Sequence, residues 1–227
     1  MPAESEIKFD QELDELKNKL LVMGGRVEWA VYASANALKN LDADLAKQII
    51  QADEAIDLLE NTIDERCLRL LATQQPVAKD LRFIAAVTKI CGCLERIADQ
   101  AVNVAERTLA LAGLDKPPEI PPTLMDMSAE ALEMVAGSLN SLVSRDGAAA
   151  RAICRRDDIV DSQNHALLEQ MIQVMMTKQR MTRSGLEIIL AGRHFERMGD
   201  EAVNICEEVV FMVEGTVIRH QPDSLQA

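Results

Sequence analysis

The sequence predicts an all-α fold built from two tandem, pseudo-symmetric three-helix bundles. Three observations support this prediction: apolar residues recur at intervals of three and four, four of the seven prolines stand in one short stretch, and the second half of the chain repeats the first. Aromatic residues make up only 3% of the chain, whereas the good helix formers Ala, Leu, Met, Glu and Lys are abundant. No segment has the sustained alternation typical of a half-buried strand.

The first half contains three amphipathic segments in succession. The apolar positions of the first are Leu13, Leu16, Leu20, Met23, Val27 and Ala30. Those of the second are Leu45, Ile49, Ala52, Ile56, Leu59 and Ile63, and those of the third include Leu94, Ile97, Ala101 and Val104. Breaks at Asn40–Asp42 and Gln74–Pro76 separate them. We therefore expect three long helices in residues 8–113.

The stretch "GLDKPPEIPP" at Gly113–Pro122 ends the first unit, because no helix continues through its four prolines. Residues 114–122 are thus expected to form a stiff, exposed linker. Residues 123–215 form the second unit, with breaks at Arg145–Gly147 and about Met181–Gly185. Its last helix carries the apolar positions Phe195, Met198, Ala202, Ile205, Val209 and Met212.

An internal repeat relates the two units. The segment "ERIADQAVNVAER" at Glu95–Arg107 returns as "ERMGDEAVNICEE" at Glu196–Glu208, displaced by 101 residues, and seven of the twelve positions from Glu95 to Glu106 are identical. The preceding segments align with a displacement of 104, so three residues are lost in the intervening turn, where changes of length are tolerated. Each unit therefore carries D-x-x-x-D on its second helix and E-x-x-x-D on its third.

These carboxylate pairs are candidate metal ligands. Residues at i and i+4 share one helix face, where like charges repel unless they take up a proton or a cation. If the second and third helices are antiparallel, four carboxylates per unit converge, and all-oxygen ligands suit Mg²⁺, Ca²⁺, Mn²⁺ or iron. The pairs are Asp53 with Asp57, Glu95 with Asp99, Asp157 with Asp161, and Glu196 with Asp200. One turn further on, Asn103 and Asn204 are candidates for a neutral carbonyl ligand or for orienting a bound water.

A second interpretation is that the acids form only a solvated helix face, neutralised by Arg96 and Arg197. The spacing alone favours this interpretation, because D/E-x-x-x-D is common in helices. The duplication of every pair makes the two interpretations equal in weight. Since Glu95 and Asp99 fall outside the apolar seam, any metal is expected near the surface.

Charge and composition exclude several functions. The net charge of −13 argues against nucleic acid or an anionic membrane as a direct partner. The N-terminus "MPAESEIKFD" has no apolar core typical of a secretory signal, and no apolar run approaches the roughly 20 residues of a membrane span. Five cysteines in a chain of this length are typical of a reducing cytoplasm. No nucleophile, nucleotide-binding or E-x-x-H motif is present, so we expect no enzyme.

Other residues give more local expectations. Gly24 and Gly25 interrupt a strong helix, which indicates a close helix crossing. Trp29 and Tyr32 are expected to pack at a helix contact, although the sole Trp also suits an interface. The segments Ala78–Arg82 and 177–183 are basic spots in an acidic chain, typical of helix-end charge but also able to dock an acidic partner.

The sequence as a whole resembles the PhoU family from about Phe9 to His220. The resemblance rests on "LDADLAKQIIQADEAID", on "QPVAKDLRFI" at Gln75–Ile84, on "LERIAD", on "GRHFERMGDEAVNICEEVVFMVEG" at Gly192–Gly215 and on the closing "IRH". It implies two tandem three-helix bundles whose acidic pairs, the four named above, hold metal ions. Iron is the expected metal, with Mg, Mn or Zn as alternatives, and multinuclear clusters are implied. The first copy departs from the family pattern at Ala98, where a methyl group is expected to crowd the site.

The resemblance also implies a function. A PhoU-like protein links the ATPase subunit of the phosphate ABC transporter to a sensor histidine kinase, modulates phosphate uptake and keeps the phosphate-starvation response off through two-component signalling. It implies a cytoplasmic homodimer that meets the membrane only through its partners, with Lys79, Asp80, Arg82 and Arg193 as candidate docking residues. Two alternatives remain: a metal-dependent enzyme that uses the carboxylate clusters, and a metal-free helical adaptor.

Overall fold

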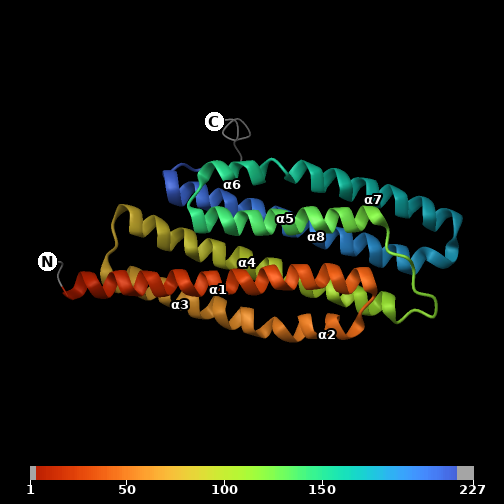
Figure 1. Cartoon of the computed structure of the whole chain (residues 1–227), viewed down its shortest axis with the longest axis horizontal. Helices are drawn as coiled ribbons and strands as arrows, with labels where there is room; N and C mark the ends of the chain where they lie inside the picture. The colour runs from red at the N-terminus through yellow and green to blue at the C-terminus, as the bar shows by residue number, and fades with distance from the viewer. Residues whose placement is uncertain (1–3, 219–227) are drawn as a thin grey trace.

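The computed structural model describes residues 4–218, and every regular element in that range is helical (Figure 1). The elements are α1 (Glu4–Asn40), α2 (Ala43–Ala52), α3 (Glu54–Gln74), α4 (Ala78–Ala112), α5 (Pro122–Ser144), α6 (Gly147–Cys154), α7 (Asp157–Thr177), the 3₁₀ turn η1 (Gln179–Met181) and α8 (Thr182–Glu214). The all-α prediction is confirmed. Of the family's closing motif, only Ile218 lies inside the described residues. No helix in this range is long and apolar enough to span a bilayer.

The second helix of each unit is not continuous, contrary to the prediction. It divides at Asp53 in the first unit and at Arg155–Arg156 in the second. At both points the backbone tightens into i→i+3 hydrogen bonds, such as Ile56 N to Asp53 O at 2.7 Å and Arg156 N to Ile153 O at 2.9 Å. A tightened turn of this kind redirects the chain without a loop. The break before the last helix also falls earlier than predicted, at Lys178, because η1 precedes α8.

The repeat extends to the turn chemistry that starts α2 and α6. Asp42 and Asp146, 104 residues apart, are the N-caps, and each side chain accepts two backbone N–H bonds of 2.9–3.0 Å. Each follows a residue in the left-handed region, Leu41 (φ 51°) and Arg145 (φ 53°). Such capping satisfies donors that the first helical turn otherwise leaves free.

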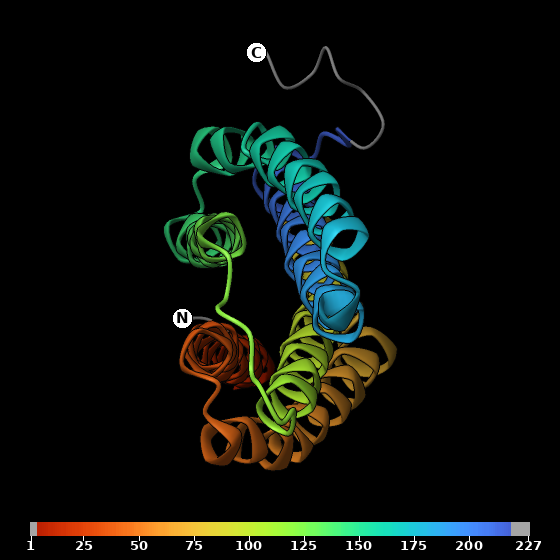
Figure 2. The same ribbon diagram turned by 90° about the vertical axis from the view of Figure 1, so that its right-hand side faces the viewer.

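The two units lie side by side, joined along α4 and α8. These long helices run antiparallel through the middle of the molecule, with α1–α3 on one side and α5–α7 on the other (Figure 1). Their contact is the most extensive between any two helices, and α1 and α5 add a smaller contact at the other edge (Figure 2). At that edge a Cβ on Gly24 would lie 2.9 Å from Leu139 Cδ2, so the expected close helix crossing is present at Gly24.

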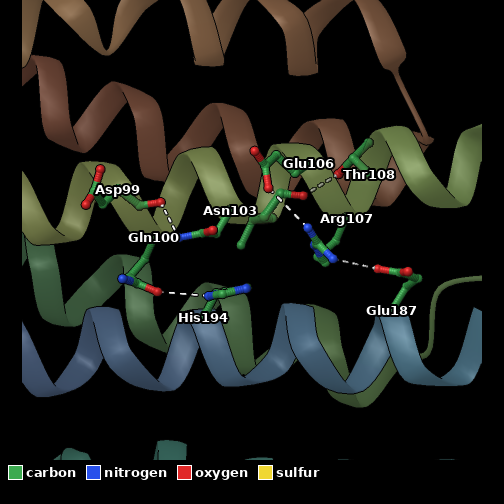
Figure 3. Close-up of polar contacts among 9 residues, drawn as sticks. Asp99, Gln100, Asn103, Glu106, Arg107, Thr108, Glu187 and His194 are labelled. Carbon is green, nitrogen blue, oxygen red and sulfur yellow. Dashed lines mark hydrogen bonds and ion pairs between the residues drawn. The ribbon is translucent and has the colours of Figure 1, made fainter.

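A polar seam lines the contact between α4 and α8. Gln100 Oε1 lies 2.8 Å from His194 Nδ1, and Arg107 bonds Glu187 at 3.1 Å (Figure 3). Towards the other end of the seam the pairs are Lys89 with Glu208 at 3.1 Å and Arg96 with Glu201 at 2.7 Å. Burial lowers the pKa of His194 to about 4, so the ring is neutral at physiological pH.

Two expectations about exposure are wrong. Pro118 and Pro121 are buried, although Pro117 and Pro122 are exposed, because the linker folds back over the start of α8 instead of standing free. Trp29 and Tyr32 do not pack in a helix contact: they are 43% and 57% exposed on the outer face of α1. The buried residues of α1, such as Leu16, Leu20 and Met23, lie on a different face of the helix.

Candidate functional site

The first carboxylate cluster forms where α3 and α4 run together. Asp53 lies at the α2–α3 junction, Asp57 on the first turn of α3, and Glu95 and Asp99 on α4. Burial, then Asp57 and Asp99, raise the pKa of Asp53 to about 6. Burial and then Asp99 raise the pKa of Glu95 to about 7. The four predicted ligands are therefore close enough to oppose one another's ionisation.

Sequence reasoning missed two members of this cluster, Glu60 and Asp64. Burial, followed by Asp64 and Asp57, raises the pKa of Glu60, and burial also raises that of Asp64. Glu60 lies at i+3 and Asp64 at i+7 from Asp57, on one face of α3. This helical spacing could have identified them as members of the cluster. The second unit has Asn164 and Leu168 at the corresponding positions, so the two clusters differ in charge.

The second cluster lies where α7 and α8 run together. Burial, then Asp161, Asp158 and Glu196, raise the pKa of Asp157 to about 6. Burial, then Asp157, Glu196 and Asp161, raise the pKa of Asp200 to about 6. The second set of four predicted ligands is therefore also brought together, in the same arrangement as the first.

The arginine nearest the first cluster does not neutralise it. Arg96 reaches across to α8, where its Nε and Nη2 donate to the Glu201 carboxylate at 2.7 and 2.9 Å. Burial, Asp99, Glu60 and Asp57 each raise the pKa of Glu95 by more than Arg96 lowers it. Beside the second cluster, Arg156 is held by Glu130 and Glu133. For the first cluster, this weakens the interpretation of the acids as a charge-balanced helix face, whereas the neutralising role of Arg197 in the second cluster stays a prediction.

The first cluster also contains oxygen atoms without donors. Asp53 Oδ1 and Asp64 Oδ1 are buried and accept no hydrogen bond. A buried carboxylate oxygen without a donor requires a proton or a cation, so the donor set fits a hard metal ion. Within residues 4–218, no three His, Cys, Asp or Glu side chains are positioned to hold an ion as they stand. Binding therefore requires the carboxylates to close around the ion.

The side-chain nitrogens of the two asparagines donate hydrogen bonds to groups other than the carboxylates of the predicted metal pairs. Asn103 Nδ2 donates to the Asp99 backbone oxygen at 2.8 Å, and Asn204 Nδ2 donates to Glu201 at 3.2 Å. Figure 3 shows the Asp99 carboxylate on the side of α4 away from α8, whereas Gln100 points toward α8. Neither amide is hydrogen-bonded to a side-chain carboxylate of the predicted metal pairs.

The first copy has a buried alanine where the second copy has a glycine. Ala98 is 1% exposed, and its counterpart is Gly199. A Cβ added at Gly199 would lie 3.6 Å from Met134 and 3.7 Å from Asp157 Oδ1, which are ordinary contact distances. An alanine would therefore fit at this position of the second copy, and the expectation that the methyl group of Ala98 crowds the first site stays a prediction.

Three of the four candidate docking residues share one pocket. Lys79, Asp80 and Arg82 line a cavity of 480 Å³ at the start of α4, together with residues from the N-terminal part of α1, Arg145 and the end of α8. Arg193 is exposed near the middle of α8. It is about 28 Å along the helix from Met212, which lines the pocket, at 1.5 Å per residue. It is therefore not part of this surface.

Comparison with known proteins agrees with the architecture. The PhoU domain model matches residues 20–108 and again residues 124–209. The chain belongs to the PhoU family. A phosphate-specific transport system accessory protein PhoU homolog from Pseudomonas aeruginosa is 37% identical over 94% of this chain and 88% of its own length. The PhoU protein of Escherichia coli is 32% identical with the same coverage.

Solved structures of this family have the same fold. The crystal structure of PhoU from Pseudomonas aeruginosa superposes with a TM-score of 0.89 at 36% identity, covering 92% of this chain and all of that one. The phosphate transport system regulatory protein PhoU from Streptococcus pneumoniae superposes with a TM-score of 0.84 at 30% identity, covering 92% of this chain and 98% of that one.

Proposed function

We propose that this protein is a metal-binding regulator of phosphate transport, accessory to a phosphate-specific transport system and without catalysis of its own. The relatives' names support the transport role. The observation that carries the metal part is the duplicated convergence of four carboxylates whose pKa values stay raised, with Arg96 offsetting only a small part of the repulsion in the first cluster. A bound cation removes that repulsion and links two helices of one unit.

The proposed ligands are the eight acids predicted from the sequence. They are Asp53, Asp57, Glu95 and Asp99 in the first unit, and Asp157, Asp161, Glu196 and Asp200 in the second. Iron is the proposed metal, with Mg, Mn or Zn as alternatives and more than one ion per cluster allowed by the number of oxygens. Glu60 and Asp64 give the first cluster the larger negative charge.

The double substitution Glu196→Gln with Asp200→Asn tests the second site. We expect it to abolish metal uptake there, because both anionic ligands from α8 are lost, and to keep the fold, because neither residue belongs to the apolar core. Metal content per chain is measured by mass spectrometry after reconstitution, and folding by circular dichroism. The matched control is Asp10→Asn with Asp14→Asn, which has the same spacing and charge change on α1.

Two outcomes would contradict the proposal. If the variant binds as much metal as the parent, the acids are only a solvated face and the protein is a metal-free adaptor. If the variant unfolds while the control does not, these carboxylates are structural.

The regulatory role is proposed in finer terms from the family resemblance. In high phosphate, the protein links the transporter ATPase subunit to a sensor histidine kinase and keeps phosphate-starvation genes off, acting as a cytoplasmic homodimer. The pocket that contains Lys79, Asp80 and Arg82 is one proposed docking surface.

Disruption of the gene is expected to derepress starvation genes in high phosphate. The purified protein is expected to bind no promoter DNA at physiological salt, because a chain of net charge −13 opposes phosphate contacts.

A further inference from the structure

A second basic surface lies at the opposite end of the molecule, where the linker folds over the start of α8. It is a groove of 840 Å³, bounded on one side by residues 114–122 and on the other by the end of α7, by η1 and by the first turns of α8. Its floor is apolar and includes Met171, Val174 and Ile188. Met171 and Ile188 are 4% and 1% exposed, so the floor is continuous with the core of the second unit.

Four cations border this groove and all are exposed. They are Lys116, Lys178, Arg180 and Arg183. None of them forms an ion pair within residues 4–218, whereas arginines elsewhere, such as Arg96, Arg107 and Arg156, are held by carboxylates. Two carboxylates on the linker, Asp115 and Glu119, border the same groove and leave it with a net charge of about +2. Such a basic surface is conspicuous in a chain of net charge −13.

The internal repeat relates this groove to the pocket at the start of α4. The displacement of 101 residues places Lys79 on Arg180 and Arg82 on Arg183, so each unit has a cation pair at the start of its third long helix. Because α4 and α8 are antiparallel, the two pairs lie at opposite ends of the molecule (Figure 1). One partner seated at each end would not obstruct the other.

We propose that the groove bordered by Arg180 and Arg183 is a docking site for an acidic segment of a partner protein, anchored by aliphatic side chains. The cations would pair with carboxylates of that segment, and the floor of Met171, Val174 and Ile188 would receive its apolar side chains. The inference rests on the proposed linking function, which requires two separate docking surfaces on one chain. It assigns the groove to one partner and the pocket of Lys79 and Arg82 to the other.

The groove fits a protein segment better than other anions. It contains no aromatic side chain on which a base could stack. Its four cations stand around an apolar floor and not along an extended basic surface, which would be needed to track a phosphate backbone or a bilayer. A second copy of this acidic chain is a competing occupant, and the oligomeric state of the variants separates it from a different protein.

The experiment measures binding of the purified transporter ATPase subunit and of the cytoplasmic part of the sensor kinase to three variants of the full chain. The first is Arg180→Glu with Arg183→Glu, the second is Lys79→Glu with Arg82→Glu, and the control is Lys39→Glu with Lys47→Glu. All three change the net charge by the same amount. Biolayer interferometry at 50 and 200 mM salt gives the affinities, and sedimentation gives the oligomeric state.

We expect the first variant to weaken binding of one partner at least tenfold at low salt and to leave the other partner within twofold. The second variant should show the reverse, and the control should bind both. The inference is overturned if the first variant binds both partners normally, if both variants lose the same partner, or if the first variant alone changes oligomeric state. If the unsubstituted protein binds neither partner, the linking function itself fails, which is a separate result.

Discussion

At the scale of single residues, burial and mutual repulsion disfavour ionisation of the carboxyl groups in the two clusters when no metal is bound. Asp53, Asp157 and Asp200 have pKa values raised to about 6, and Glu95 to about 7, with burial as the first cause in every case. A group whose pKa is raised on folding binds protons more tightly in the folded state. Its stabilising effect is therefore present at low pH and is lost as the pH rises through the folded-state pKa.

This predicts an inverted pH dependence for the metal-free protein. Its melting temperature should fall as the pH rises from 5 to 8, because the clusters ionise between the unfolded values near 4 and the folded values of about 6 to 7. Thermal melts in the presence of a chelator measure this. His194 acts in the opposite direction, since its pKa is lowered to about 4 and its contribution is lost as the pH falls below 6.5.

The control for that titration is His194→Gln, which should steepen the decline of the melting temperature. Substituting Asp157 and Asp200 by Asn should flatten it. A melting temperature that rises from pH 5 to 8 in the His194→Gln variant would show that repulsion in the clusters does not govern stability.

At the scale of elements, the repeated caps show how closely the two units follow one another. Asp42 and Asp146 cap equivalent helices through equivalent bonds, and each follows a residue with positive φ. The helices around them were predictable, because apolar periodicity and proline placement report local structure directly. The division of the second helix was not, because the apolar stripe continues through Asp53 and no glycine or proline marks the tightened turn.

The residues of the candidate site, like the helices, could be predicted from the sequence only in part. Its eight principal acids were predictable from repeated i, i+4 spacing, whereas Glu60 and Asp64 were overlooked because they lack counterparts in the second unit. Ion pairs such as Arg96 with Glu201 lie 105 residues apart in the sequence and follow only from the packing of α4 on α8. Local patterns contain no information about such a contact.

Removal of a cap is the prediction at this scale. Asp146→Ala should lower the free energy of unfolding by about 1 kcal/mol, because two backbone N–H groups at the start of α6 lose their acceptor. Chemical denaturation at pH 7 measures the change. Asp158→Ala, within the first turn of α7, is the comparison, and equal effects of the two substitutions would argue against capping as the cause.

At the scale of the whole molecule, the two units share one interface, and this should make them unfold together. Arg96→Met removes the bidentate partner of Glu201 and should lower the free energy of unfolding by about 1 kcal/mol, a modest value because Arg96 is half exposed. Hydrogen exchange followed by mass spectrometry should show α3 and α7 losing protection at the same denaturant concentration, both before and after the substitution. Independent loss of protection in one unit would contradict a shared interface as the source of cooperativity.

In the polar seam between α4 and α8, the two units contribute different charges: Lys89 and Arg96 lie on α4, and Glu208 and Glu201 lie on α8. If α4 met an α4 from another molecule in the same register, the displacement of 101 residues would bring Arg107 opposite Lys89, where Glu208 now stands, and Gln100 opposite Arg96, where Glu201 now stands. Like charges or a neutral amide would replace two ion pairs. The duplicated units are therefore complementary and not interchangeable, because a chain assembled from two first units would lack the carboxylates that pair with Lys89 and Arg96.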